Sequence, residues 1–518
     1  MLGKKYLINV CFIGVIVFAI LGNFGRVMTS FNHNEHMYIT TGVLVSQNKV
    51  LYKDFAYLQM PYLPLFYSGV YKIFGLNTFY FFIGKLISFL ALMVSASILF
   101  LFARQVSKDE NFSLGITGLY LLNTSIIIPA SEVSNYVLPV VFSFIAIYLY
   151  EISLRRNTRK VFLLALSGLF IGLAFGTKLT YASIGFPFVL TFFITFLMNR
   201  HQKSALKEWL LKTIIPWSLG LFLGLLPVLF FYWMDPEAFI FNNLGYHQLN
   251  TQWRVITGFT YNMTSASKVA FGWEIITNPD NLVILCGVFL GILISRHIHN
   301  QIPNFDVRLI LAFTLFLIGL LTAVTPTPSF SQYYAMPVSF LFICFVYAWG
   351  DHDSNENSLR YRRALLLGLV LVTLIFNGLF FTSNIAGMRD IKNWSPIYIR
   401  DISLKIREIL RENQSDQNLK IGTLSPLFAV ESGLNVYKEL STGPFLYRVG
   451  DLLTPEQRKR FVGSSPSTID DLFESDPPAA ILIGFEGDLD QPLLEYALAN
   501  KFRKINLTGF KGELYIRP

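Results

Sequence analysis

The sequence predicts an α-helical polytopic membrane protein that ends in a small α/β domain, and three observations support this fold class. Of the 518 residues, 53% are hydrophobic and only 14% are charged. The mean hydropathy of +0.48 is well above that of soluble globular proteins. Long apolar runs recur through residues 1–383, whereas residues 384–518 have the composition of a soluble domain. We therefore expect a transmembrane domain over 1–383 and an extracytoplasmic α/β domain over 384–518.

Eleven segments approach the roughly 20 apolar residues that a transmembrane helix needs. They start near Tyr6, Asn77, Phe112, Val137, Val161, Thr180, Trp209, Asn281, Arg308, Ser331 and Ala364. The first one follows Lys4 and Lys5, and no small-residue cleavage pattern comes after it. This favours a retained anchor over a cleaved signal peptide. Because some runs are short, ten or twelve spans are the structural alternatives.

Basic residues between the spans predict the orientation in the membrane. The net charge of +9 comes largely from short connecting segments. These segments hold Arg104, Lys108, Arg155, Arg156, Arg159, Lys160, Arg200, Lys203, Lys207, Arg296, Arg360, Arg362 and Arg363. With eleven spans they all fall on the side of Lys4 and Lys5, which the positive-inside rule places in the cytoplasm. We expect a multi-pass protein of the plasma (inner) membrane with its C-terminal domain outside, and no nucleic-acid partner.

A short aromatic segment decides this topology. Residues 61–74 are apolar but too few to cross the membrane, and counting them as a span would place Arg104 and Lys108 outside. We predict a helix in the outer interface that begins near Pro61 or Pro64. Residues 27–76 then form the first outer loop, where we expect the catalytic chemistry.

The C-terminal region alternates between helical and strand patterns. One helix face is formed by Ile402, Ile406, Ile409 and Leu410. Strands are predicted at 419–424 and 479–484, helices at 455–461 and 491–502, and a closing hairpin within 505–516. This order predicts a small α/β layer. The region has no glycine-rich phosphate loop, so we assign it no catalysis.

Three carboxylates are candidates for a general base. Glu35 and Asp54 lie in the first outer loop, and Glu132 lies in a turn on the same side of the membrane. A carboxylate in a partly dry site can accept a proton from an acceptor group, although Glu35 and Asp54 can equally be solvated loop charges. His33, Glu35 and His36 can together hold a divalent metal ion, but their spacing matches no recognised metal site. We therefore favour no metal and no cofactor.

Two lysines and one amide are candidates for substrate binding. Lys178 ends the fifth span at the outer face, where it can bind a lipid phosphate or simply snorkel and complement the helix dipole. Lys85 lies about eight residues inside the second span, so it needs an anionic partner or water. Asn135 can face the same cavity as Glu35 or be an ordinary turn residue.

Taken in order, these motifs resemble the GT-C superfamily of integral membrane glycosyltransferases. The resemblance is to the branch that contains protein O-mannosyltransferases and lipid A aminoarabinose transferases, and it covers roughly the first 350 residues. The C-terminal α/β domain is a looser match. In the first outer loop, Asn34-Glu35 matches an Asp-Glu pair of the family, Tyr38 matches an aromatic residue, and 52–64 matches the loop that leads into the interfacial helix. Asn135 matches a second acid, and Thr177-Lys178 matches a Thr-Lys motif. Residues 235–247 match a long-loop signature that ends at His247, and Tyr333 to Pro337 match a Tyr-to-Pro entry into a late span.

The resemblance implies that a sugar is transferred from a polyprenyl-phosphate carrier to a glycolipid, polysaccharide or protein at the outer face, among membrane lipids and without an obligatory metal. It implies that substrate is bound by Asn34, Tyr38, Lys85, Asn135, Lys178, His247 and Tyr333. Amides have no useful basicity at neutral pH. Since Asn34 and Asn135 replace acids of the family, Glu35, Asp54 or Glu132 must then act as the base.

Two other functions stay open at this point. An inactive relative that uses its outer domain as a binding module would explain the two asparagines Asn34 and Asn135. A polysaccharide or lipid transporter would explain the spans and the intramembrane Lys85. A transporter also predicts internal repeats and broken helices, and we see neither in the sequence.

Overall fold

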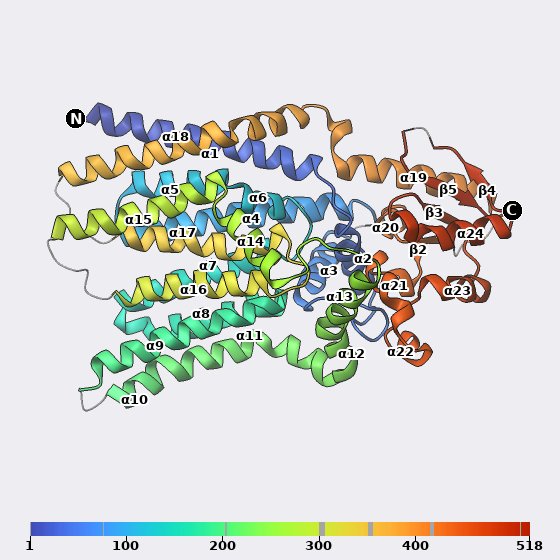
Figure 1. The fold of residues 1–518 in the computed structure, drawn as a ribbon, viewed down its shortest axis with the longest axis horizontal. Coiled ribbons are helices and arrows are strands. Elements are labelled where there is room, and N and C mark those ends of the chain that lie inside the picture. Colours follow the sequence, from blue (N-terminus) through green and yellow to red (C-terminus); the bar gives the residue numbers. More distant parts are fainter. Residues whose placement is uncertain are drawn as a thin grey trace.

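The computed structural model describes residues 2–75, 77–201, 205–299, 306–350, 356–414, 419–507 and 509–518. Lys203 lies outside the described residues. So do the side chains of Lys4, Lys5, Arg296 and Arg360. The chain forms a helical bundle that carries a small mixed domain at one end, and the first helix starts at the opposite end (Figure 1).

The bundle contains the predicted spans in the predicted order. Among the described residues, nine helical segments are long and apolar enough to cross a membrane, and two bent pairs raise the number to eleven. The straight spans are α1 (Leu2–Thr29), α4 (Tyr80–Ser107), α7 (Val137–Arg155), α8 (Lys160–Thr177), η2 with α9 (Leu179–Ile184 and Gly185–Asn199), α10, η3 and α11 (Ala205–Trp209, Leu210–Ile214 and Ile215–Met234), α16 (Val307–Val324), η5 with α17 (Ser331–Tyr334 and Ala335–Trp349), and α18 (Glu356–Gly387). The prediction of about eleven spans is confirmed.

Two spans are bent, which the sequence did not indicate. α5 (Glu110–Leu122) meets α6 (Thr124–Ala130) at 60°, and α14 (Ser265–Ile276) meets α15 (Pro279–His299) at 72°. At the first bend Asn123 has an extended backbone. The carboxylate of Asp280 accepts hydrogen bonds from the Thr124 backbone N–H at 2.7 Å and from its hydroxyl at 2.6 Å. The Asp280 side chain of the α14–α15 span therefore accepts a backbone hydrogen bond that the α5–α6 span has lost at its bend.

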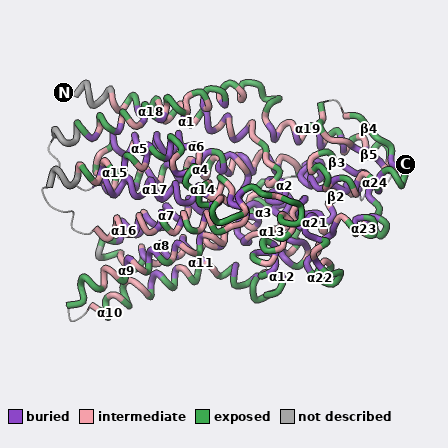
Figure 2. Tube along the Cα trace, in the orientation of Figure 1, coloured by how far each residue is buried: buried purple, intermediate pink, exposed green. Residues whose placement is uncertain are grey.

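The core of the bundle surrounds α17, whose residues Ala335 to Trp349 are all buried. Exposed residues follow α18 and α11 at opposite edges of the bundle, where large apolar side chains are left uncovered (Figure 2). α8 and α11 pack through glycines. A Cβ atom at Gly220 would lie 1.8 Å from the Ala165 carbonyl oxygen, so only glycine permits this close approach.

The first outer loop folds into two helices, α2 (Glu35–Ser46) and α3 (Tyr62–Phe74). α3 follows Pro61 and ends at Gly75, whose φ of +57° suits a residue without a side chain. It buries one aromatic face and leaves Ile73 81% exposed. The predicted short helix beside the spans is therefore present, while α2 was not anticipated.

The C-terminal domain contains a five-stranded sheet in the order β2-β1-β3-β5-β4. Its strands are β1 (Lys420–Thr423), β2 (Asn435–Val436), β3 (Ala480–Ile483), β4 (Arg503–Ile505) and β5 (Glu513–Ile516), and its helices are α19 (Ser395–Asn413), α20 (Leu427–Glu431), α21 (Pro444–Val449), α22 (Pro455–Arg460), α23 (Ile469–Ser475) and α24 (Gln491–Ala499). β1 pairs in parallel with β2 and β3, and β5 pairs antiparallel with β3 and β4. The predicted α/β layer and closing hairpin are confirmed. The short strand β2 was not predicted, and α18 continues to Gly387.

The domain is fixed against the outer loop and the bundle. The Glu431 carboxylate of α20 accepts hydrogen bonds from the backbone N–H groups of Phe79 and Phe81 at 2.8 and 2.6 Å. α21 packs against α13 (Tyr246–Ile256), which follows α12 (Pro236–Ile240) and η4 (Phe241–Gly245). Apolar residues of the outer loop and of the domain share one core. The outer loop, the bundle and the C-terminal domain therefore hold fixed positions around the space between them.

Candidate active site

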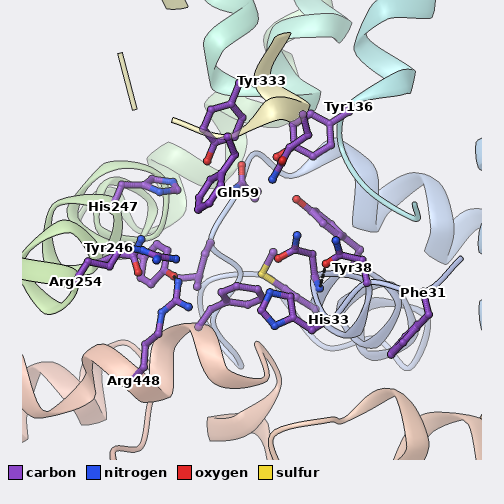
Figure 3. Close-up of a pocket in the computed structure, with 18 residues that line it drawn as sticks. Phe31, His33, Tyr38, Gln59, Tyr136, Tyr246, His247, Arg254, Tyr333 and Arg448 are labelled. Atoms are coloured by element: carbon purple, nitrogen blue, oxygen red, sulfur yellow. Dashed lines mark hydrogen bonds between the residues drawn. The ribbon is translucent and has the colours of Figure 1, made fainter. Parts of the chain in front are cut away.

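Two adjoining cavities lie where the bundle meets the C-terminal domain. The first, which we call the polar cavity, has a volume of about 550 Å³ and lies among the loop before α2, α13 and α21 (Figure 3). The second, the apolar cavity, has a volume of about 500 Å³ and lies among α13 and the ends of α8, α16 and α17. They share Gln59, Tyr136, His247, Asn250, Phe330, Gln332 and Tyr333. A single ligand can therefore occupy both.

The ionisable lining of the polar cavity is basic. Among the described residues, its charged or titratable walls consist of arginine, histidine and tyrosine, with no aspartate or glutamate. The full lining is Phe31, Asn32, His33, Asn34, Met37, Tyr38, Leu58, Gln59, Tyr136, Tyr246, His247, Asn250, Arg254, Phe330, Gln332, Tyr333, Phe445 and Arg448. Such a wall favours an anionic ligand.

Arg254 and Arg448 supply the positive charge. Arg448 donates from Nη2 to the Tyr246 hydroxyl at 3.1 Å, and its guanidinium lies 5.2 Å from the Trp253 ring centroid. The Nε atom of each arginine is buried without a hydrogen-bond partner. Burial and the charge of Arg448 lower the pKa of Arg254. No acidic partner of either arginine occurs in the described part of the chain. Two neighbouring cations without a counter-ion among the described residues are suited to bind an anion.

His247 faces both cavities from α13 (Figure 3). Although His247 is exposed to solvent by its accessible surface, the atoms packed around its imidazole lower the pKa of the ring to about 4, because they partly desolvate its charged form. It is therefore neutral near pH 7 and can donate one hydrogen bond and accept another. This placement agrees with the predicted substrate-binding role, which stays a prediction.

A chain of hydrogen bonds joins three segments at the cavity wall. The Tyr38 hydroxyl donates to Asn135 Oδ1 at 3.2 Å, and Asn135 Nδ2 donates to Gln59 Oε1 at 3.0 Å. Tyr38 lines the polar cavity and Asn135 the apolar one, while Asn34 lines the polar cavity at the start of α2. The structure thus brings together three residues that the sequence had marked.

Lys178 stands at the break between α8 and η2 and lines the apolar cavity. Its ammonium lies 3.5 Å from the ring centroid of Tyr136 and 5.4 Å from that of Tyr333. Both tyrosines are shared by the two cavities, so the lysine lies next to the opening between them. Cation–π contacts of this kind hold an ammonium without neutralising it.

Glu35 and Lys85 line neither cavity, because they bind each other below the wall. The Glu35 carboxylate lies 2.7 Å from Lys85 Nζ, and both side chains are fully buried. Glu35 also accepts from the Val133 and Asn32 backbone N–H groups at 2.6 and 2.8 Å. The ion pair therefore connects neighbouring segments of the structure and lies away from both cavities.

The other two carboxylates also lie outside the cavities. Asp54 is partly exposed and accepts from the Val50 backbone N–H at 2.7 Å. Glu132 accepts from Asn32 Nδ2 at 2.8 Å, and its second oxygen is buried without a partner. Burial raises the pKa of Glu132 to about 7, and the charge of Glu35 adds to the shift. Glu132 reaches the polar cavity only through Asn32, which lines it.

The sequence did not single out Arg254 and Arg448 as site residues. Neither arginine stands out in the sequence, because Arg254 lies in a long loop and Arg448 lies in a domain to which the sequence assigned no catalysis. His36, proposed with His33 as a metal ligand, is buried next to the Phe31 ring, with ring centroids 5.3 Å apart. Within the described ranges, no three His, Cys, Asp or Glu side chains are grouped as metal ligands would be.

Comparisons with known proteins identify the fold. No protein-family model and no curated protein sequence matches the chain. The structure is similar to ArnT from Cupriavidus metallidurans bound to undecaprenyl phosphate, with a TM-score of 0.62 and 12% identity over 98% of this chain and 97% of that one. The structure of ArnT from the same organism in the apo state has a TM-score of 0.59 to this chain at 12% identity, over 99% of this chain and 98% of that one. The archaeal oligosaccharyltransferase AglB from Archaeoglobus fulgidus, in complex with an inhibitory peptide and a dolichol-phosphate, gives 0.50 at 12% identity, over 99% of this chain and 74% of that one.

The chain therefore has the overall fold of the ArnT structures, a helical membrane bundle followed by a small C-terminal α/β domain. The similarity to ArnT covers the C-terminal domain as well, beyond the roughly 350 residues that the motifs indicate.

Proposed function

We propose that this protein is a glycosyltransferase that moves a sugar, a hexose or a pentose, from a polyprenyl-phosphate-linked donor to a glycolipid, polysaccharide or protein acceptor. The observation that carries the proposal is the junction of a basic polar cavity with an apolar cavity at the ends of the spans. A lipid-linked sugar likewise has a polar part, the sugar, and an apolar part, the lipid chain, which are joined by a phosphate.

The phosphate is bound by the cations around the junction. Arg254 and Arg448 offer guanidinium groups that lack an acidic partner in the described chain, and Lys178 offers an ammonium beside Tyr136 and Tyr333. Arginine binds phosphate through paired, charge-assisted hydrogen bonds. Because the leaving phosphate gains charge as its bond to the sugar breaks, fixed cations stabilise that step. ArnT and AglB structures with bound polyprenyl phosphates are consistent with this role.

The apolar cavity receives the first part of the lipid tail. Its wall includes Leu179, Ala323, Ala335 and Met336, which come from the ends of neighbouring spans. Apolar pockets with a few polar groups at one end bind and orient amphipathic ligands. The sugar then lies in the polar cavity, within reach of Asn34, Tyr38 and His247.

The reaction takes place at the outer face of the plasma membrane, with the N-terminus in the cytoplasm. The support is the position of the exposed residue Arg156, which follows the last residue of α7, whereas Tyr136 at the other end of α7 lines the polar cavity. Positive charge favours the cytoplasmic side. The polar cavity and the C-terminal domain then face outward.

The test is binding of undecaprenyl phosphate to the full chain in lipid nanodiscs, followed by transfer assays with native membranes. The donors for transfer are undecaprenyl-phosphate sugars that carry labelled mannose, glucose, galactose or 4-amino-arabinose. The double variant Arg254→Gln, Arg448→Gln should bind undecaprenyl phosphate at least about tenfold more weakly, since each charged hydrogen bond contributes about 1.5–3 kcal/mol. Lys459→Gln removes an exposed charge of the same domain and should change nothing. A wild-type protein that neither binds the lipid nor transfers any label contradicts the proposal.

A further inference from the structure

The polar cavity holds an imidazole in a position that suits proton transfer. His33 lies in the loop before α2 and lines the cavity, and 48% of its side chain is exposed (Figure 3). The Phe445 ring meets the His33 ring edge-on, with the ring centroids 5.5 Å apart. The imidazole is therefore accessible and supported on one face.

A carboxylate of the C-terminal domain approaches the same ring. Glu486 Oε2 lies 3.5 Å from His33 Nδ1, and the Glu486 side chain is only 7% exposed. Its other oxygen, Oε1, is buried without a hydrogen-bond partner. Such contacts are often long in unliganded sites and shorten when substrate binds. Among the described residues, the group that pairs with Glu486 is the His33 imidazole, through a proton on Nδ1.

The loop that carries Glu486 is held firmly. The Asp490 carboxylate accepts hydrogen bonds from the backbone N–H groups of Gly484, Phe485 and Glu486 at 2.8, 2.9 and 2.9 Å. The Phe485 ring stacks on Phe428 with centroids 5.2 Å apart. Glu486 therefore approaches His33 from a rigid support, as a group that orients a catalytic side chain must.

We propose that His33, oriented by Glu486, is the general base of the transfer reaction. This inference rests on the proposed function. A carboxylate at Nδ1 keeps the proton on that nitrogen, so that Nε2 presents a free lone pair to the cavity. His33 is then the catalytic residue, and Glu486 is a positioning residue that also stabilises the imidazolium once it forms.

The step balances as follows. An acceptor hydroxyl oxygen bonds to the anomeric carbon of the sugar while its proton passes to His33 Nε2. The bond from the anomeric carbon to the phosphate oxygen breaks, and its electron pair stays on the phosphate. Arg448 faces that phosphate, and its guanidinium lies 5.1 Å from the same Phe445 ring that supports His33. The proposed base His33 and the cation Arg448, which faces the leaving phosphate, therefore both lie next to Phe445.

The position of His33 also accounts for the amide at Asn34. The base lies one residue earlier in the loop, so Asn34 needs no charge. The C-terminal domain, to which the sequence assigned no catalysis, then completes the active site through Glu486. The competing base is Glu132, which reaches the cavity only through Asn32.

The experiment compares full-chain variants in nanodiscs with the undecaprenyl-phosphate sugar that the wild type uses. His33→Gln should lower kcat about a hundredfold to ten-thousandfold, the usual loss for a general base, while undecaprenyl phosphate binds normally. Glu486→Gln should give a smaller loss in kcat without a change in binding. Asp488→Asn removes an exposed carboxylate two residues away and should leave kcat unchanged.

Chemical rescue separates catalysis from structure. His33→Ala leaves room for free imidazole, which should restore part of the transfer rate, whereas imidazole should not rescue Glu486→Gln. Near-normal kcat in His33→Gln overturns the inference, and so does a base-sized loss that appears in Glu132→Gln alone. If the wild type neither binds undecaprenyl phosphate nor transfers sugar, the proposed function itself fails.

Discussion

The carboxylate of Glu35 and the ammonium of Lys85 lie 2.7 Å apart, and neither side chain is exposed. Lys85 also donates to the Ser131 carbonyl oxygen at 2.8 Å, while Glu35 accepts from the Val133 N–H. The pair therefore ties α2 to α4 and to the turn before α7. The sequence had suggested Glu35 as a base and Lys85 as a substrate-binding residue in need of an anionic partner, and the structure shows that Glu35 is that partner.

Breaking this pair should destabilise the protein. Glu35→Gln or Lys85→Met alone leaves one buried charge without its partner, which typically costs about 3–5 kcal/mol. We expect a clear loss of Tm in detergent for each single variant and a smaller loss for the double variant. The exposed pair of Lys212 and Glu208 is the control, and Lys212→Met should change Tm very little. A normal Tm with lost transfer in Glu35→Gln would return Glu35 to a catalytic role.

Lys178 should act on donor affinity. Lys178→Met keeps the length of the side chain over Tyr136 but removes its charge. We expect affinity for undecaprenyl phosphate to fall about tenfold, the effect of one charge-assisted hydrogen bond. Lys178→Arg should retain most of the affinity, and Tm should stay close to that of the wild type. Unchanged lipid affinity in Lys178→Met would show that the lysine only snorkels from the helix end.

Glu132 should make stability depend on pH. Its pKa is about 7 in the folded protein, against an ordinary value of 4.5, because it is buried. Between these values the folded protein keeps a proton that the unfolded chain has lost, so stability falls as pH rises. Tm should therefore decrease from about pH 5 to pH 8 in the wild type, and decrease less in Glu132→Gln. Glu431, whose pKa burial also raises to about 7, titrates in both proteins, so the difference reports Glu132. Equal decreases would contradict this.

The topology is tested by single-cysteine labelling after Cys11, Cys286 and Cys344 have been replaced. A membrane-impermeant maleimide added to intact spheroplasts should label Asp488→Cys at once. Arg156→Cys should react only after the membrane is permeabilised. Both positions are exposed, so access to the reagent depends on the side of the membrane alone. Labelling of Arg156→Cys in intact cells, with protection of Asp488→Cys, would reverse the orientation.

The membrane architecture could be predicted from the sequence because its determinants are local. A span satisfies its own backbone hydrogen bonds, so the length of an apolar run and the charges around it are sufficient to locate it. α3 follows from Pro61 and from a run too short to cross. β1, β3 and the closing hairpin follow from short apolar runs that turn residues bound. These features need no knowledge of what packs against them.

The geometry of the candidate active site depends on contacts between distant segments, which leave no periodic trace in the sequence. Glu35 has the same appearance in sequence whether it is solvated or paired with Lys85, and the burial that pairs them is decided by the packing of α2 on α4. His33 gains Glu486, and Arg254 gains Arg448, only because the C-terminal domain docks on the outer loop. The sequence by itself determined the spans, the helix beside them and the α/β layer, together with motifs that resemble those of the GT-C superfamily. The tertiary structure decided which charges are neutralised and which face the cavity, since that choice depends on distance in space.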